Sequence, residues 1–234
     1  MYSVRDIAEK DLHKALEQVA ALGYSAVEFA GLFGNKPETV REWLGGLGLE
    51  AWGTHTGLDA LEKDFNGVVK EHRALGCNVL TVPWLSPATR EETDAVIEKL
   101  SDYSRRLASE GITLSYHNHA HEFAPNKDGV FFWNELVSRT ALPLEMDTYW
   151  VYAAAEDPLQ WMDRLSAAGR LPLIHLKDGL SGGEGKPLGM GTAPVAAVHE
   201  RAKDCGAKII VESETLCPSG IDEARICIEY LKAL

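Results

Sequence analysis

Residues 112–123 read ITLSYHNHAHEF, an apolar-rich run that leads directly into three histidines, an asparagine and a glutamate. Side chains alternate between the two faces of a strand, so the apolar residues of 112–117 share one face and His117 lies on the other. If the apolar face packs on helices, His117 and His119 point into the interior. The stretch therefore predicts a buried strand that ends in polar, chemically active groups.

The rest of the chain repeats this pattern of a short apolar run followed by an amphipathic, helix-like stretch. Runs with helical spacing lie at 12–22 and 95–107, and glycines close several of them. The predicted strands are 2–5, 26–30, 51–55, 78–84, 112–117, 142–147, 171–177 and 208–212. Eight such units favour a single-domain α/β fold over residues 1–234, a (β/α)8 TIM barrel. The alternative is an open doubly wound sheet, but its glycine-rich phosphate turn is absent after the first predicted strand.

The amino-acid composition of the chain limits the classes of partner that the protein is expected to bind. The chain has 234 residues, of which 45% are hydrophobic and 25% charged, with a formal net charge of −12. This acidic balance disfavours nucleic acid as a partner. No apolar run reaches the roughly 18 residues of a membrane span, and the first residues lack the apolar core of a signal peptide. The four cysteines form no CxxC pair and are expected to be buried thiols. We therefore expect a cytoplasmic protein.

Ionisable side chains recur at the ends of the predicted strands, on the face opposite the apolar residues. They are His55, Glu145, Asp147, His175, Lys177, Glu212 and Glu214. In a barrel these positions meet at the carboxyl-terminal rim, where active sites form. Buried carboxylates and imidazoles that converge need a cation to neutralise them. The predicted ligands are Glu122, Asp147, His175 and Glu212, around one divalent metal ion such as Mn²⁺, Mg²⁺, Co²⁺ or Zn²⁺.

Seven motifs, in this order, resemble those of the xylose-isomerase-like barrel superfamily, and within it the sugar phosphate isomerase/epimerase group. They are YSVRD, GYSAVEFAG, GLGLEAWGTHTGLDAL, YHNHAHEF, EMDTYW, LIHLKD and IIVESE. The resemblance implies a divalent metal held by Glu, Asp, His and Glu, which transfers by motif to the same four residues. It also implies a homodimer. The chain departs from the pattern in starting within the first strand and in an abbreviated helix after HEFAP.

The predicted chemistry is isomerisation or epimerisation of a small carbohydrate. A hydroxy-ketone bound to the cation would lose its α-proton to form an enediolate. Glu122 and Glu212 would be the catalytic bases on opposite faces of the sugar, as the resemblance implies for related epimerases. We expect Lys177 to hold a substrate hydroxyl or developing oxyanion. Further substrate-binding residues would be His55, Trp84, His117 and His119, with Trp84 stacking on the sugar.

Three other functions stay open. The same α-proton abstraction followed by loss of a β-hydroxyl would make the protein a keto-sugar or inosose dehydratase. An apurinic endonuclease would need a three-zinc cluster and a basic DNA face, which the acidic charge disfavours. A non-catalytic sugar-binding barrel would turn over nothing. Metal counting and product analysis discriminate among these functions.

Overall fold

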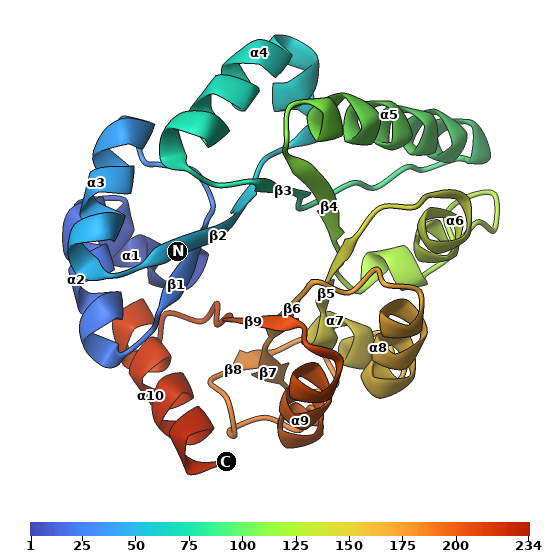
Figure 1. Cartoon of the computed structure of the whole chain (residues 1–234). Coiled ribbons are helices and arrows are strands. Elements are labelled where there is room, and N and C mark those ends of the chain that lie inside the picture. The colour runs from blue at the N-terminus through green and yellow to red at the C-terminus, as the bar shows by residue number, and fades with distance from the viewer.

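Seven parallel strands form an almost closed barrel surrounded by helices in the computed structural model, which describes residues 1–234 (Figure 1). The strands are β1 (Ala26–Phe29), β2 (Glu50–His55), β3 (Val79–Val82), β4 (Thr113–His117), β5 (Leu144–Asp147), β6 (Leu173–Leu176) and β9 (Lys208–Val211). They pair in chain order, β1-β2-β3-β4-β5-β6-β9. This order confirms the predicted α/β barrel and excludes the doubly wound sheet, in which strand order reverses.

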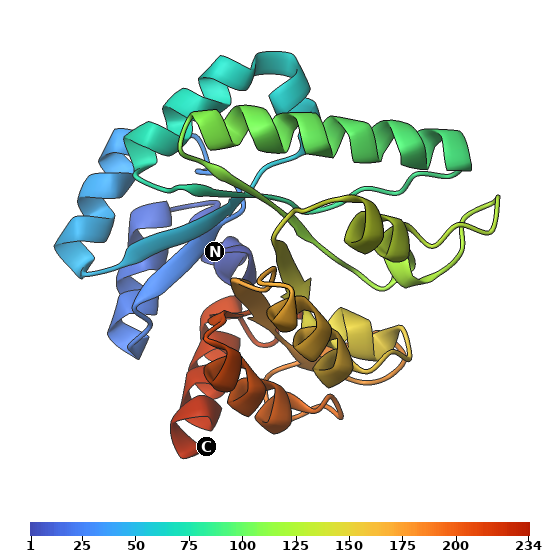
Figure 2. The same cartoon turned by 45° about the vertical axis from the view of Figure 1, so that its right-hand side comes forward.

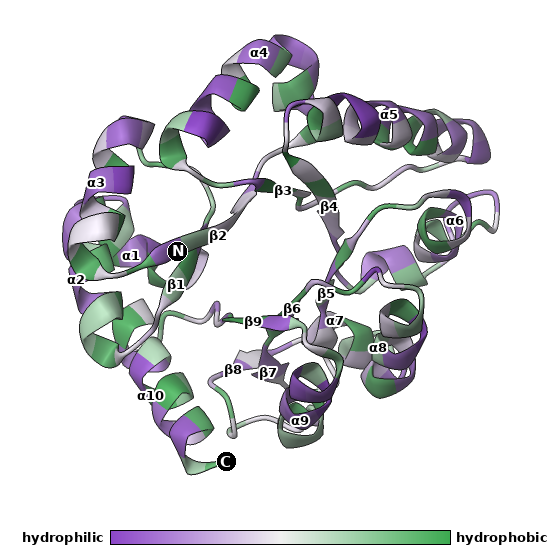
Figure 3. Ribbon diagram, viewed as in Figure 1, coloured by the Kyte–Doolittle hydropathy of each residue, from purple (hydrophilic) through white to green (hydrophobic).

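The helices lie outside the barrel, as the rotated view also shows (Figure 2). The longer ones are α2 (Leu12–Leu22), α3 (Pro37–Leu47), α4 (Leu58–Leu75), α5 (Arg90–Ser109), α8 (Pro158–Ala167), α9 (Val195–Cys205) and α10 (Gly220–Ala233). The shorter ones are α1 (Arg5–Ala8), α6 (Phe132–Arg139), α7 (Thr148–Ala153), η1 (Tyr2–Val4) and η2 (His121–Phe123). Helices such as α5 carry hydrophobic and hydrophilic bands (Figure 3), and the hydrophobic bands bury the core between helices and sheet. None of the helices is both long and apolar enough to cross a membrane.

Prolines set the boundaries of several strands. Pro83 follows β3, whereas Pro143 and Pro172 directly precede β5 and β6. Proline has no N–H to donate to a ladder, so the regular pairing is shorter than the predicted runs 78–84, 142–147 and 171–177. After β6 the chain forms a small antiparallel hairpin, β7 (Asp178–Gly179) with β8 (Gly185–Lys186).

The predicted strand at 2–5 is wrong, because these residues form η1 and the start of α1. The Met1 amine donates to the carbonyl of Glu28 on β1, and Ser3 Oγ accepts from the Ser213 N–H beyond β9. Single contacts of this kind bridge β1 and β9 in place of a ladder, while helical bonds such as Glu9 N–H to Arg5 O satisfy the local backbone. The sheet has seven strands for this reason.

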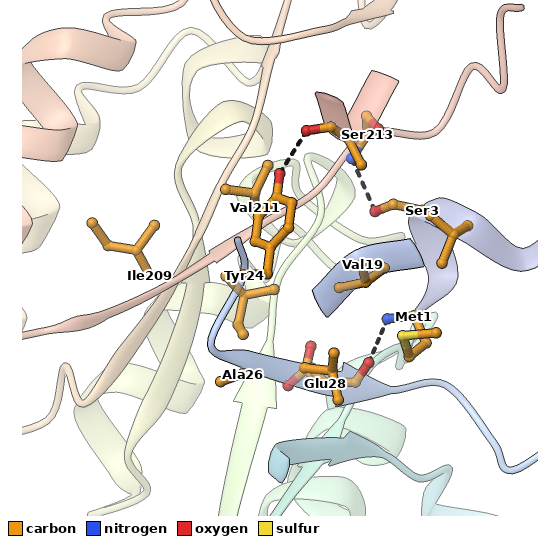
Figure 4. A pocket seen from close by; sticks show the side chains of 13 residues that line it. Met1, Ser3, Val19, Tyr24, Ala26, Glu28, Ile209, Val211 and Ser213 are labelled. Carbon is orange, nitrogen blue, oxygen red and sulfur yellow. Dashed lines mark hydrogen bonds between the residues drawn. The ribbon is translucent and has the colours of Figure 1, made fainter. Parts of the chain in front are cut away.

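A small cavity of about 70 Å³ lies in the space between β1 and β9 (Figure 4). Its lining is mostly apolar and includes Val19, Ala26, Ile209 and Val211, with Glu28 at one side. The cavity separates the unpaired edges of β1 and β9 along the barrel wall.

Candidate metal centre and substrate pocket

Strand register brings the ionisable residues to one end of the barrel. His117 is paired with Glu145 and Asp147 with His175, so each pair points to the same face of the sheet. Glu145 and Asp147 are two residues apart on β5 and therefore share that face as well. Glu212 follows the last residue of β9. The period of the strands thus directs these side chains into the lumen.

The first group, here called the rim group, consists of His117, Asp147, His175 and Glu212. One ligand atom of each lies within 4.8 Å of the others, and all four residues are buried. His175 Nδ1 lies 3.1 Å from Glu212 Oε2. Three of the four residues predicted as metal ligands, Asp147, His175 and Glu212, are therefore brought together, and His117 lies with them.

Glu122, the fourth predicted ligand, lies outside the rim group. One of its carboxylate oxygens accepts from Tyr116 Oη at 2.8 Å and the other from the His119 N–H at 2.8 Å. It belongs to a separate group with His119 and His121. The physical reason is the turn of η2, which follows Asn118 and directs Glu122 back against its own loop. Both oxygens already have donors, so Glu122 anchors this loop.

The rim group fits a divalent cation by its donor atoms and by the free carboxylate oxygen of Asp147. Asp147 Oδ1 accepts from the Trp150 N–H at 2.9 Å, but the buried Oδ2 has no hydrogen-bond partner. Burial raises the pKa of Asp147 to about 7, against the opposing effect of the Lys177 ammonium. A buried carboxyl with a free oxygen beside two imidazoles and a second carboxylate is the donor set that Zn²⁺, Mn²⁺ or Co²⁺ prefers.

The second group, here called the lumen ring, consists of Glu28, His55, Glu145 and His175. His175 Nε2 bonds Glu28 Oε2 at 2.7 Å, and His55 Nε2 bonds Glu145 Oε1 at 2.7 Å. The crossed contacts are 3.1 Å for His55 to Glu28 and 3.0 Å for His175 to Glu145. Carboxylate and imidazole thus alternate around the ring, with His175 shared between the ring and the rim group.

The charges in the lumen ring strongly shift the pKa values of its histidine and carboxyl groups. Burial by itself would lower the pKa of His55, but the Glu28 and Glu145 carboxylates outweigh burial and raise that pKa to about 10. Burial would raise the pKa of Glu145, but His175 and His55 hold it well below its usual value. The Thr81 hydroxyl also donates to Glu145 at 2.9 Å. His55 is therefore a cation that neutralises the ring.

A pocket of about 480 Å³ opens above these groups and accounts for most of the predicted substrate contacts. Its lining includes His55, Trp84, His117, His119 and Glu212. The Trp84 ring is 55% exposed and lies 4.6 Å from the His119 ring, centroid to centroid. An exposed indole beside a polar lumen suits the C–H face of a sugar.

Lys177 is fully buried at the edge of the rim group. Its Nζ lies 2.7 Å from Glu214 Oε2, 3.8 Å from Glu212 Oε2 and 4.5 Å from the centre of the Trp150 ring. Burial would lower the pKa of Lys177, but Asp147 and the two glutamates reverse this effect and raise it. Lys177 is therefore a fixed cation next to Glu212.

The fold and these strand-end motifs match known proteins. A family model described as a xylose isomerase-like TIM barrel matches residues 16–234. The chain belongs to this family. Among curated relatives, the inosose dehydratase of Geobacillus kaustophilus is 27% identical over 190 residues, which are 70% of this chain and 61% of that protein. The chain therefore spans less than two thirds of that relative's length.

Solved structures agree on the fold. A sugar phosphate isomerase/epimerase from Parabacteroides distasonis superposes with a TM-score of 0.83 at 20% identity, over 99% of this chain and 91% of that one. The IolI protein, solved with a bound zinc atom, gives a TM-score of 0.76 at 12% identity, over 99% of this chain and 95% of that one. Both likenesses show the fold that this chain shares with these proteins.

The roles of two residues of the site were not predicted from the sequence. Glu28 is the single acid in the apolar strand β1, where alternation places it opposite Val27 and Phe29, and that isolation was the available signal. Glu145 was placed inward at the rim but was not predicted to bind a metal or a substrate. His117 was predicted to contact substrate and was not considered as a ligand.

Proposed function

We propose that the protein is a divalent-metal-dependent isomerase of sugars or keto-sugars that removes the proton on the carbon next to a carbonyl group. The carrying observation is the convergence of His117, Asp147, His175 and Glu212 within 4.8 Å, beneath the pocket. A divalent cation bound there would polarise the substrate carbonyl and stabilise the negative charge that develops as the proton leaves. The curated relative and the structural neighbours make a sugar the expected substrate class.

Glu212 is the proposed base. Burial would raise its pKa, but His175 and Lys177 hold the pKa of this carboxyl well below its usual value, so it is ionised at neutral pH and can accept a proton. Glu212 also lines the pocket, whereas the oxygens of Glu122 are occupied by Tyr116 and the His119 backbone. One carboxylate supports transfer between neighbouring carbons on one face of the substrate. It does not support the predicted exchange between two glutamates on opposite faces.

Trp84 and His119 are proposed to orient the substrate. The indole would cover an apolar face of the sugar, and His119, whose ring contacts that of Trp84, would contact a hydroxyl group. His55 lines the same pocket, but its Nε2 contacts Glu145 and Glu28. We therefore propose that His55 balances the charge of these two carboxylates.

Dehydration is the second candidate, and Lys177 is the observation that favours it. After Glu212 removes the α-proton, loss of a β-hydroxyl needs an acid to protonate the leaving oxygen. The Lys177 ammonium, 3.8 Å from Glu212 Oε2, is the nearest fixed cation able to do so. The inosose dehydratase relative is consistent with this outcome.

Turnover of ketoses and keto-inositols in heavy water, with mass analysis of the products, separates the candidates. An isomerase incorporates deuterium without change of composition, whereas a dehydratase yields a product lighter by one water. Changing Glu212→Gln should lower turnover by roughly 10²–10⁴-fold. The exposed Glu184→Gln variant, on the neighbouring hairpin, is the control and should retain turnover.

Elemental analysis of the same samples tests the site itself. About one divalent ion per chain is expected, and about three would favour the endonuclease instead. A Glu212→Gln variant that binds metal and keeps full turnover would contradict the assignment of the base. If no substrate turns over in metal-loaded wild type while sugars still bind, the protein is a sugar-binding barrel.

A further inference from the structure

We infer that Glu28 and Glu145 are positioning residues that fix the tautomer of His175 and so direct its Nδ1 at the cation of the rim group. The inference rests on the proposed function, because it takes the rim group as the metal centre. Both carboxylates lie in the lumen ring, and neither is a proposed ligand or base. Glu28 is on β1 and Glu145 on β5, so the two reach His175 on β6 from different sides of the barrel.

The contacts of His175 decide which nitrogen keeps its proton when a cation binds. Nε2 lies 2.7 Å from Glu28 Oε2 and 3.0 Å from Glu145 Oε1. Carboxylate oxygens only accept hydrogen bonds, so Nε2 is protonated. Nδ1, on the other side of the ring, faces Glu212 Oε2 at 3.1 Å and lies within the rim group, so it also holds a proton when no cation is bound. Because two carboxylates hold Nε2–H, a cation at the rim group would displace the Nδ1 proton and meet the lone pair of that nitrogen.

His55 completes this arrangement by fixing the two carboxylates. Its Nε2 donates to Glu145 at 2.7 Å and lies 3.1 Å from Glu28, and its ring stacks on that of His175 at 5.4 Å between centroids. Thr81 Oγ1 holds the second oxygen of Glu145. Glu28 is held through its own backbone, which accepts from the Met1 amine. Each acceptor of the His175 proton is therefore itself anchored.

Burial makes His175 depend on Glu28 and Glu145 as the acceptors of its Nε2 proton. Glu28, Glu145 and His175 are at most 5% exposed, so water cannot replace a missing acceptor without opening the lumen. Carboxylate partners of a metal-bound histidine orient its ring and raise its basicity, and their loss typically weakens metal binding 10–100-fold. We therefore expect a Glu28→Gln variant to bind Zn²⁺ 10–100-fold more weakly than wild type, with a similar loss in Glu145→Gln.

The experiment titrates Zn²⁺ into metal-free wild type, Glu28→Gln and Glu145→Gln in the presence of a competing chelator. The control is Glu223→Gln, a fully buried carboxylate at the start of α10 that accepts from Thr215 and Cys217 and touches neither group. It should bind Zn²⁺ as wild type does. Circular dichroism checks that each variant folds, and Glu28→Asp, which keeps the charge, should retain more affinity than Glu28→Gln.

A second readout reports the tautomer directly. Long-range ¹H–¹⁵N spectra of the Zn²⁺-loaded protein, with the His175 signals assigned through a His175→Gln variant, identify the protonated ring nitrogen. Wild type should show Nε2 protonated and Nδ1 bound to metal. In Glu28→Gln the Nε2 proton of His175 should exchange faster with water. A general loss of packing would speed exchange in other rings as well, so a change confined to His175 supports the positioning role.

Several outcomes would overturn the inference. Unchanged Zn²⁺ affinity with an unchanged His175 spectrum in both glutamine variants would show that the ring carboxylates do not position the ligand. A second Zn²⁺ in wild type that is lost in Glu28→Gln would show that the lumen ring binds a cation itself. If wild type binds no divalent ion at all, the proposed function fails together with this inference, whereas binding that is insensitive to Glu28 and Glu145 removes the inference alone.

Discussion

At the scale of single residues, the protein separates two kinds of histidine in one lumen. His55 lies between two carboxylates that raise its pKa to about 10. His117, 5.0 Å away between ring centroids, has its pKa lowered to about 4, chiefly by burial, since the pull of Glu145 does not compensate. Two carboxylates thus raise the pKa of His55, whereas the one carboxylate beside His117 does not overcome burial and the neighbouring His175 and His55. A neutral imidazole such as His117 is the form that can bind a metal.

The low pKa of His117 predicts a pH dependence of the stability of the metal-free chain. Between pH 6.5 and about 4 the unfolded chain takes up a proton at this residue and the folded chain does not, so stability falls as the pH falls through this window. The size of the loss is about 3 kcal/mol, because each pKa unit corresponds to about 1.4 kcal/mol. Urea unfolding with chelator present, in wild type and His117→Asn, measures it.

The difference in the pH dependence of stability between wild type and His117→Asn separates the contribution of His117 from those of the other titratable groups. His55 contributes in the opposite direction, since its raised pKa gives stability that is complete below pH 6.5 and disappears as the pH rises through about 10. If His117→Asn loses as much stability as wild type between pH 6.5 and 4, His117 is not the group responsible.

At the scale of elements, Asp178 organises the segment that follows β6. It is buried, and its carboxylate accepts from the backbone N–H groups of Gly179, Gly189, Gly191 and Ala193 at 2.7–3.2 Å. A side chain in place of Gly191 would meet Asp178 Oδ1 at 2.2 Å, which explains the glycine there. One carboxylate thus ties the segment that follows the β7–β8 hairpin to β7.

Removing this carboxylate should destabilise the protein. In Asp178→Ala four backbone N–H groups lose their acceptor, and a buried donor left without a partner costs about 1–3 kcal/mol. We expect a loss of about 2–4 kcal/mol in the free energy of unfolding, because water can reach part of the segment. Thermal or urea unfolding measures the loss. The exposed Glu184→Ala variant on the same hairpin should change stability by no more than about 0.5 kcal/mol, and equal effects of both variants would contradict this assignment.

At the scale of the whole molecule, the lumen contains more charge than a barrel core usually tolerates. Glu28, Glu145, Asp147, Glu212 and Lys177 are all buried there, alongside three histidines. A buried carboxylate without a partner is costly, and the free Oδ2 of Asp147 is one such cost. A divalent cation would offset it, so metal binding and folding should be coupled in this protein.

This coupling predicts a rise in melting temperature on adding metal. A ligand at about 100 times its Kd stabilises the native state by about 2.7 kcal/mol, which shifts the midpoint of a domain of this size by roughly 5–10 °C. Differential scanning calorimetry of wild type with and without Zn²⁺ or Mn²⁺ measures the shift, and chelator should reverse it. Asp147→Asn should lose most of the shift, and a full shift in that variant would place the cation elsewhere.

The sequence by itself determined the barrel and the inward direction of Asp147, His175 and Glu212. Both follow from local periodicity, because a strand that shows apolar residues to its helices must show the alternate residues to the lumen. Glu122 lies five residues beyond the end of β4, where this period no longer applies. The side chain of Glu122 was therefore beyond its reach, and η2 turns it onto Tyr116.

Only the tertiary structure decided the remaining features. Residues 2–5 have the pattern of a strand but form η1 and α1, because their available contacts are single bonds to β1 and β9. The bond from His175 to Glu28 joins residues 147 positions apart and depends on how the barrel closes. Periodicity gives the face on which a side chain lies, whereas the partner it meets across the lumen depends on the register and spacing of all seven strands together.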